Sequence, residues 1–313
     1  MPSSRPAPKD LASLTPDALF DELVPPEQLR QLVARALAED LGAAGDVTGD
    51  AMVPTSAMGR GVVRARDGGV VCGVRVALEV LAQAAPGCRA SVHAPDASRV
   101  QAGDAVLSIE GPLRGLLAAE RTMLNFLGHL SGISTLTARF ADLVVGTRAQ
   151  VLDTRKTIPG LRMLAKHAVR CGGGTNHRIG LFDAMLVKDN HVAGLSPGAM
   201  ATAVAEAAGR ARAAHALRFV EVECDSVEQF RAIAALPAGT VDYALLDNMD
   251  PARLAECVRI RDAQAPRMLL EASGGVRLET VRAIAEAGVD RISIGGLTHS
   301  APALDVGLDV EAP

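Results

Sequence analysis

The chain has 313 residues, of which 49% are hydrophobic and 22% charged, which is typical of a globular protein with one large domain or two unequal ones. Its net charge of −4 offers no basic excess, so no nucleic-acid partner is expected. The five cysteines are odd in number and include no CxxC pair. We therefore expect reduced thiols in a cytoplasmic protein, and neither a zinc site nor a disulfide framework.

Residues 1–10 are polar and rich in proline, and they lack the apolar run of a signal peptide. We expect them to form a disordered tail. No uncharged apolar stretch is long enough to span a bilayer, so no membrane association is expected either.

The next part of the chain mixes helices with short strands. Apolar residues recur at helical spacing over residues 27–41, and a polar loop with Gly42, Gly45 and Gly49 follows. Beyond it the pattern predicts strands at 61–66, 69–73, 90–93 and 105–110, and helices at 74–84, 113–128 and 133–143. This order of elements indicates an α+β domain.

After about residue 148, short apolar strands alternate with helices of about 10–15 residues, which is the βα pattern of a parallel sheet. Strands are predicted at 150–153, 184–187, 219–223, 243–246, 268–271 and 291–294, and helices at 160–171, 196–213, 226–235, 251–262 and 277–287. The repeat predicts a TIM-like barrel, either complete or incomplete. A doubly wound open sheet is the alternative, but no GxGxxG follows the first strand.

The predicted strands end in polar or glycine-rich clusters, where a β/α barrel carries its reactive groups. A basic group consists of Arg155, Lys156, His177, Arg178 and Lys188, to which Arg121, Arg162 and Lys166 are candidate additions. Cations that converge in one cleft predict a substrate with several negative charges.

The other clusters are acidic and glycine-rich. Glu223 and Asp247 beside a polyanion site predict Mg²⁺, the hard cation that carboxylates share with phosphate. Ser273-Gly274-Gly275 and Gly295-Gly296 precede helices, where bare backbone N–H groups bind phosphate. Together the clusters predict a site for a phosphorylated sugar with a metal-bound phosphate and an acidic co-substrate.

Several of these residues also have a structural interpretation. Arg162 and Lys166 stand at i and i+4 of a predicted helix and fit a solvated face equally well. His177 alone would more often be structural than catalytic. Glu221 and Glu223 point to the same side of one strand, so the sequence leaves open which of them is functional.

The longer motifs resemble those of the quinolinate phosphoribosyltransferase family. They are Asp153-Thr154-Arg155-Lys156-Thr157-Ile158-Pro159-Gly160, Gly172-Gly173-Gly174-Thr175-Asn176-His177-Arg178, Val187-Lys188-Asp189-Asn190-His191, Glu120-Arg121-Thr122-Met123-Leu124-Asn125 with Ser131-Gly132-Ile133, and Glu39-Asp40-Leu41-Gly42 with Gly45-Asp46-Val47-Thr48. The similarity extends from about residue 27 to about residue 310.

The resemblance implies an α/β fold with an N-terminal α/β sandwich domain and an incomplete TIM-like α/β barrel. The sandwich would span 11–130 and the barrel 131–298, with 299–313 packing back onto the first domain. It implies a homodimer with shared active sites, while assembly beyond the dimer stays open. The implied reaction joins quinolinate and phosphoribosyl pyrophosphate into nicotinate mononucleotide, with release of pyrophosphate and CO₂, in NAD biosynthesis.

The resemblance also implies residue roles. Lys156, Lys188, Glu223 and Asp247 would be catalytic, and Glu223 and Asp247 would also hold Mg²⁺. Arg121 would reach in from the partner subunit. The other substrate contacts would be Arg155, Arg162, Lys166, His177, Arg178, Ser273, Gly274, Gly275, Gly295, Gly296 and His299.

Three other functions fit parts of the pattern. A Schiff-base aldolase or decarboxylase would use Lys156 or Lys188 as its nucleophile but leaves the acidic pair unexplained. A molybdenum-uptake-associated paralogue of the same family would act on a different acceptor, and the intact Asn176-His177-Arg178 motif favours the quinolinate enzyme over it. A non-catalytic sensor of phosphorylated ligands is the third.

Overall fold

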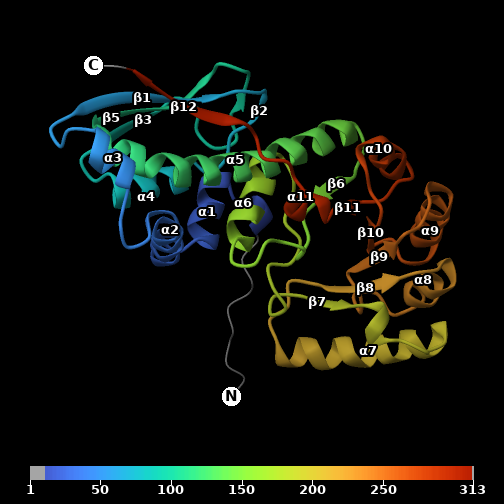
Figure 1. The fold of residues 1–313 in the computed structure, drawn as a ribbon. Coiled ribbons are helices and arrows are strands. Elements are labelled where there is room, and N and C mark those ends of the chain that lie inside the picture. Colours follow the sequence, from blue (N-terminus) through green and yellow to red (C-terminus); the bar gives the residue numbers. More distant parts are fainter. Residues whose placement is uncertain (1–10, 312–313) are drawn as a thin grey trace. The chain divides into compact units, whose positions relative to one another are not determined.

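A computed structural model describes residues 11–311, so the predicted tail at 1–10 lies outside the described residues (Figure 1). The described chain forms two compact units. One contains residues 14–138, 158–173 and 297–311, and the other contains residues 139–157 and 174–296, with the short 3-10 turn Leu11–Ser13. The predicted boundary between residues 130 and 131 falls inside a helix.

Four α-helices of the first unit lie within residues 11–85. They are α1 Pro16–Leu23, α2 Pro26–Leu41, α3 Val47–Met52 and α4 Val74–Ala84. The sequence interpretation missed α1 and placed α3 in a loop. Both are short, but each has a side-chain cap: the Thr15 hydroxyl accepts from Ala18 N–H, and the Asp46 carboxylate accepts from Thr48 and Gly49 N–H.

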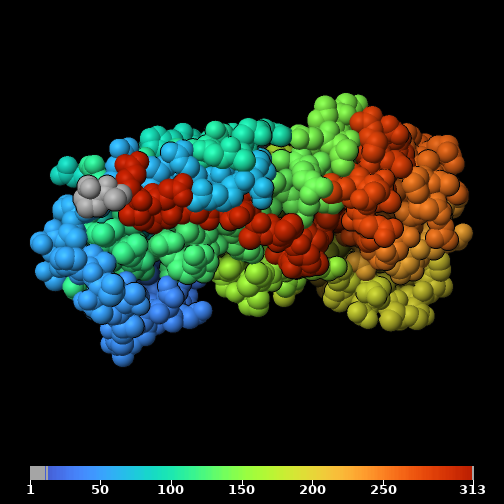
Figure 2. Space-filling model, turned by 45° about the horizontal axis from the view of Figure 1, so that its top comes forward, coloured from blue at the N-terminus to red at the C-terminus, as the bar shows by residue number. Residues whose placement is uncertain are grey.

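An antiparallel sheet forms the other layer of this unit, in the order β12-β1-β5-β3. Its strands are β1 Met58–Ala65, β3 Arg89–Val92, β5 Ala105–Pro112 and β12 Val306–Glu311, and the pair β2 Gly69–Val70 and β4 Arg99–Val100 stands apart. The last strand, β12, lies along β1 with Arg60 opposite Glu311 and Ala65 opposite Val306. Figure 2 shows this red segment against the blue and cyan part of the surface.

Helix α5, Leu113–Val144, is a single helix of 32 residues, so the prediction of two helices here was wrong. Gly128 and Gly132, at the break between the two predicted helices, are needed for packing. Gly128 carbonyl accepts from Leu304 N–H at 2.9 Å, and a Cβ at Gly132 would overlap the Pro302 carbonyl oxygen. Gly172, which follows helix α6 Arg162–Cys171, approaches α5 at Ser134 in the same way. Glycine therefore allows backbone contact with α5 from two other segments.

The second unit contains a six-stranded parallel sheet in the order β6-β11-β10-β9-β8-β7. Its strands are β6 Gln150–Leu152, β7 Met185–Val187, β8 Val220–Cys224, β9 Tyr243–Asp247, β10 Leu269–Ser273 and β11 Arg291–Ser293. The helices are α7 Pro197–Ala214, α8 Val227–Ala234, α9 Pro251–Gln264 and α10 Leu278–Glu286, with the 3-10 turn η2 Asp189–His191; the short α11 Gly296–His299 crosses into the first unit.

The strand order identifies this sheet as an incomplete barrel. From β7 through β11 and then β6, each strand pairs with its neighbour in this order. The two edge strands, β6 and β7, do not pair with each other, so the barrel is open between them. A doubly wound sheet would reverse its order at a switch point, and this one does not. Thr175 bonds to the outer edge of β6 through Val151 and Asp153, so the open edge is partly covered. The predicted TIM-like fold is confirmed.

Within residues 11–311 no helix, α5 included, has both the length and the apolarity needed to cross a membrane.

The packing of α5 predicts that Gly132→Ala is destabilising. The new methyl group must displace backbone at Pro302, so we expect the melting temperature to fall by roughly 2–10 °C, the effect of an overpacked core. Gly209→Ala is the matched control, because Gly209 lies inside α7, a Cβ there would have nothing within 4 Å, and alanine favours helix. Equal melting temperatures for Gly132→Ala and the wild type would contradict this packing.

Candidate active site

Asp153 fixes the first loop of the barrel mouth. It follows β6 directly and is fully buried. Its carboxylate accepts hydrogen bonds from the Asn176 side chain at 2.7 Å and from His177 N–H at 2.9 Å. The Asn176-His177-Arg178 segment is thereby attached to the end of β6. The sequence interpretation included Asp153 in the strand-end cluster but assigned it no role.

The His177 side chain belongs to a buried cluster of charges inside the barrel. Its Nε2 lies 2.9 Å from Glu221 and 3.3 Å from Glu271, and Arg291 Nε lies 2.9 Å from the other oxygen of Glu271. All four side chains are buried. Two acids and two bases balance one another here, and neither Glu271 nor Arg291 was predicted as a partner. The only signal for them was that their strands, β10 and β11, are neighbours of the predicted site.

Burial and ion pairing act in opposite directions on these groups. Burial alone would lower the pKa of His177, but Glu271 and Glu221 outweigh it and raise the pKa to about 9. Burial would raise the pKa of Glu271, but His177 and Arg291 lower it to about 2. Glu221 and Glu271 therefore favour a proton on Nε2, whereas Nδ1 accepts from Arg178 N–H and needs a lone pair to do so.

Arg178 and Arg155 form the basic part of the mouth. Arg178 is buried; its N–H donates to His177 Nδ1 at 2.7 Å and its guanidinium donates to the Ala184 carbonyl at 3.3 Å. Burial, followed by the charge of Arg155, lowers the pKa of Arg178. Arg155 Nε is buried without a hydrogen-bond partner among the described residues, and the exposed Lys156 follows it. Two guanidinium groups that repel one another, one with an unused donor, favour an anionic ligand.

The acidic part of the mouth is arranged around Lys188. Lys188 Nζ lies 2.6 Å from Glu223 at the end of β8. Burial and then the charge of Glu223 raise the pKa of Asp247, and the same two causes raise that of Asp225. Asp189, Glu223 and Asp225 also line a pocket of about 250 Å³. Carboxylates this close to one another suit a cation ligand.

The two candidate carboxylates on β8 have different surroundings. Both point to the barrel interior, as expected for residues at i and i+2. Glu221 is completely buried and paired with His177, whereas Glu223 lies one layer nearer the mouth with Lys188 and the charge of Asp247. This contrast favours Glu223 as the residue that meets a ligand.

The loop after β10 has a left-handed backbone at its glycines. Asn248, Gly274 and Gly275 all have positive φ, and a Cβ on Gly274 would overlap the Asn248 side chain. Asn248 N–H donates to the Ser273 carbonyl at 2.9 Å, which links the ends of β9 and β10. The second loop, Gly295-Gly296, follows β11, and Gly296 faces open space.

Four predicted site residues belong to the other unit, so their roles remain predictions. Arg121 lies on α5 with 64% of its side chain exposed, 3.8 Å from Glu120. Lys166, on α6, is fully buried, so a solvated face is the wrong interpretation for it, whereas Arg162 in the first turn is partly exposed. His299 ends α11 with Nδ1 2.5 Å from the Ser300 hydroxyl.

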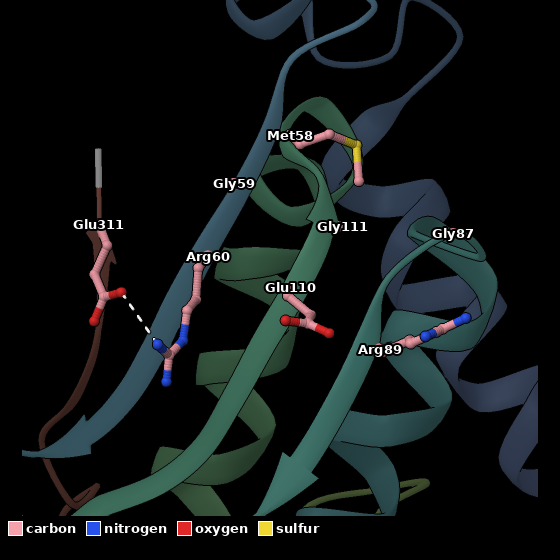
Figure 3. Close-up of a pocket in the computed structure, with 8 residues that line it drawn as sticks. All are labelled: Met58, Gly59, Arg60, Gly87, Arg89, Glu110, Gly111 and Glu311. Carbon is pink, nitrogen blue, oxygen red and sulfur yellow. Dashed lines mark ion pairs between the residues drawn. The ribbon is translucent and has the colours of Figure 1, made fainter. Parts of the chain in front are cut away.

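A further pocket in the first unit contains none of these residues (Figure 3). It lies over the sheet, where Glu311, Arg60, Glu110 and Arg89 stand opposite one another on four adjacent strands. The charges alternate across the sheet, and Arg60 and Glu311 are 3.6 Å apart. Such a cross-strand row stabilises an exposed sheet face, which accounts for this pocket without a ligand.

The barrel and its mouth define a class of protein: an α/β enzyme scaffold with an anion site beside a group of carboxylates at the C-terminal ends of parallel strands. Comparisons with known proteins narrow the class. Residues 46–131 match the family model "Quinolinate phosphoribosyl transferase, N-terminal domain", and residues 133–309 match its C-terminal domain. The chain belongs to the quinolinate phosphoribosyltransferase family.

Individual relatives agree with the family match. The chain is 45% identical to a nicotinate-nucleotide pyrophosphorylase [carboxylating] of Mycobacterium leprae, over 90% of this chain and 96% of that protein. It is 36% identical to a probable enzyme of the same name from Bacillus subtilis, over 90% and 93%. The solved structure of the nicotinate-nucleotide pyrophosphorylase from Francisella tularensis matches with a TM-score of 0.83 and 35% identity, covering 92% of this chain and 98% of that one.

The buried cluster predicts a loss of stability in alkali. A folded-state pKa of about 9 for His177, above 6.5 in the unfolded chain, means that its contribution is complete below pH 6.5 and disappears as the pH rises through about 9. We expect the free energy of unfolding, measured in urea, to fall by on the order of 2 kcal/mol over this interval.

His177→Gln should weaken this pH dependence, although the variant is less stable at neutral pH because Glu221 and Glu271 lose their cation. His215→Gln, at the exposed end of α7, is the control and should keep the wild-type slope. An unchanged slope in His177→Gln would show that another group causes the alkaline loss.

Proposed function

We propose that this protein is a quinolinate phosphoribosyltransferase of the decarboxylating type. It would transfer the phosphoribosyl group of phosphoribosyl pyrophosphate to the nitrogen of quinolinate and release pyrophosphate and CO₂, so that nicotinate mononucleotide is formed for NAD biosynthesis. One observation supports the proposal: Arg155 follows β6, and Glu223 and Asp247 stand at the ends of β8 and β9, so basic and acidic groups belong to the same, C-terminal edge of the parallel sheet. A substrate dicarboxylate fits the first group, and a ribose with a metal-bound pyrophosphate fits the second.

The basic group would hold quinolinate. Arg155 and Arg178 offer guanidinium donors, of which the buried Arg155 Nε has no partner within residues 11–311. Lys156 adds a positive charge at the exposed rim. The His177 imidazole is engaged with Glu221 and Glu271, so we assign it a positioning role, through its Nδ1 bond to Arg178 N–H.

The acidic group would hold the ribose end and Mg²⁺. The fit is supported by the oxygen-rich donor set of Glu223 and Asp247, whose mutual repulsion raises the pKa of Asp247 after burial has done so. Bound there, Mg²⁺ would neutralise charge on the departing pyrophosphate. Lys188, paired with Glu223, would orient that carboxylate and exchange partners when substrate binds. Backbone N–H groups of the loops that contain Ser273, Gly274, Gly275, Gly295 and Gly296 would bind phosphate.

The chemistry needs positioning and charge stabilisation more than a strong nucleophile. The bond between ribose C1 and pyrophosphate breaks through an oxocarbenium-like state, and the quinolinate nitrogen forms the new bond to C1. The electron pair left when the 2-carboxylate departs as CO₂ stays on ring carbon C2, where the adjacent positive nitrogen stabilises it, and that carbon then takes up a proton. Arg155, Arg178 and Lys156 would favour the substrate ring with two carboxylates over the product ring with one.

We also propose that the protein is a cytoplasmic homodimer in which Arg121 completes the partner's site. The proposal is supported by the exposure of Arg121 and by the weakness of its single 3.8 Å ion pair to the adjacent Glu120. Arg162, Lys166 and His299 are proposed as further substrate contacts.

The substrate assignment is tested by a product assay with quinolinate, phosphoribosyl pyrophosphate and Mg²⁺, with nicotinate as the alternative acceptor. With phosphoribosyl pyrophosphate and Mg²⁺ present, wild-type protein should form nicotinate mononucleotide when the acceptor is quinolinate and form none when the acceptor is nicotinate. Arg155→Ala and Lys156→Ala should each reduce kcat/KM by about a hundredfold or more, because each removes a charge from the anion site. Arg210→Ala, exposed on α7, is the control with normal activity.

Two results would contradict the assignment. Near-normal activity in both variants would overturn the site. No product from either acceptor, with phosphoribosyl pyrophosphate still bound, would favour a family member with another acceptor.

The shared site is tested by mixing two inactive chains. Arg121→Ala and Lys156→Ala, unfolded together and reassembled, should recover roughly a quarter of wild-type activity, because half of the dimers then hold one intact site of two. Each variant reassembled alone is the control. Absence of recovery, with dimers present by light scattering, would place Arg121 in the site of its own chain.

A further inference from the structure

The proposed mechanism leaves one group of buried reactive side chains unused, in the unit that carries the four-stranded sheet. It consists of Cys72, Asp96, His167 and Cys171, whose ligand atoms all lie within 4.8 Å of one another. Cys72, His167 and Cys171 are buried, and the Asp96 side chain is 5% exposed. These side chains come from three distant parts of the sequence, so cysteine spacing gave no sign of them.

Each side chain is held in place by the surrounding backbone. Ser131 of α5 binds both backbone groups of Cys72, at 2.9 and 3.1 Å. Asp96, in the turn between β3 and β4, accepts from Val74 N–H with one carboxylate oxygen and keeps the other for the cluster. His167 and Cys171 are one helical turn apart on α6, so they project from the same face. The cluster is therefore pre-organised from several directions.

The bonding at His167 is not that of a catalytic triad. In a triad, the two imidazole nitrogens serve different partners, the carboxylate on one side and the nucleophile on the other. Here a single nitrogen, Nε2, lies 2.9 Å from Asp96 and 3.3 Å from Cys171 Sγ. Within residues 11–311 the other nitrogen, Nδ1, is buried without a hydrogen-bond partner. The four donor atoms thus gather within 4.8 Å of one another on one side of the ring, as the ligands of a metal ion do.

The distances suit a tetrahedral ion after a small expansion. Zinc binds sulfur at about 2.3 Å and nitrogen or oxygen at about 2.0–2.2 Å, so neighbouring ligand atoms of a tetrahedral site are about 3.3–3.8 Å apart. The separations of 2.9 and 3.3 Å around Nε2 are only a few tenths of an ångström shorter. Shifts of this size are available to side chains without rearrangement of the backbone.

We propose that Cys72, Asp96, His167 and Cys171 bind a structural Zn²⁺ ion, or another divalent ion of similar softness. Two sulfurs, an imidazole and a carboxylate fill four positions, which leaves none for water or substrate and makes the site structural. Thiolate ligands select against Mg²⁺, so this site differs in chemistry from the oxygen-rich mouth of the barrel. The ion would join α6 and the Asp96 turn to the segment before α4, and it would enter while this unit folds.

The test uses the full chain, unfolded with a chelator and refolded with Co²⁺ or Zn²⁺. The Co²⁺ form should show a thiolate-to-cobalt charge-transfer band and the visible bands of a tetrahedral ion, and Zn²⁺ should remain at about one ion per chain after gel filtration. Zn²⁺ should also raise the melting temperature of the metal-free protein. Cys171→Ser should lose the charge-transfer intensity of one thiolate and weaken Zn²⁺ binding by more than about a hundredfold, measured against a chromophoric chelator.

Cys88→Ser is the matched control, because Cys88 lies in the same unit outside the cluster and is only partly buried. It should bind Zn²⁺ as the wild type does. Three results would overturn the site: less than about a tenth of an ion per wild-type chain, bound Co²⁺ without a thiolate band, or a disulfide between Cys72 and Cys171 in the freshly purified protein. The wild-type Co²⁺ spectrum decides the matter even if Cys171→Ser does not fold, and none of these measurements depends on transferase activity.

Discussion

The buried carboxylate of Asp153 is the interaction on which the barrel mouth depends. It binds Asn176 and the backbone of His177, so the loop after α6 is held against β6. With the loop fixed, the His177 ring reaches Glu221 and Glu271 in the barrel interior, and Arg178 receives its place beside Arg155. An uncharged substitute at Asp153 would weaken the hold on Asn176 and His177 and leave the loop attached to β6 through the backbone bonds of Thr175. The loop at the barrel mouth is therefore positioned by a carboxylate buried beneath it.

The barrel interior separates charges by depth. In the lower layer, Glu221 and Glu271 are neutralised by His177 and Arg291, and Arg291 also lies over the Tyr243 ring at 4.1 Å. In the layer above, Lys188 is the one cation among the described residues that pairs with Glu223, while Asp225 and Asp247 gather near it. The described residues thus balance their charges in the interior and leave an excess of negative charge around Lys188, in the acidic part of the mouth. The balanced lower layer is a structural arrangement of charged residues, whereas the unbalanced upper layer is suited to binding a ligand.

Sequence reasoning predicted the barrel because parallel strands and helices alternate at a regular spacing, and it predicted the polar strand ends because they are local. It failed where the decisive contact is distant. Gly128 and Gly132 looked like the end of a helix because their reason for being glycine, residues 302–304, lies far along the chain. A solvated face was one of two interpretations of Lys166, because helical spacing shows a face without showing what covers it. Nor does spacing reveal that Cys72 and Cys171 meet.

The path of the chain through the first unit has a consequence for biosynthesis. This unit contains the earliest described helices, yet its edge strand β12 is made after the whole second unit, and the Arg66–Asp309 ion pair joins residues 243 positions apart. The part that is translated first therefore has to wait, with β1 unpaired on one side, until β12 has been made. An exposed strand edge is a site of misassembly, so chaperone demand should be greatest during this interval.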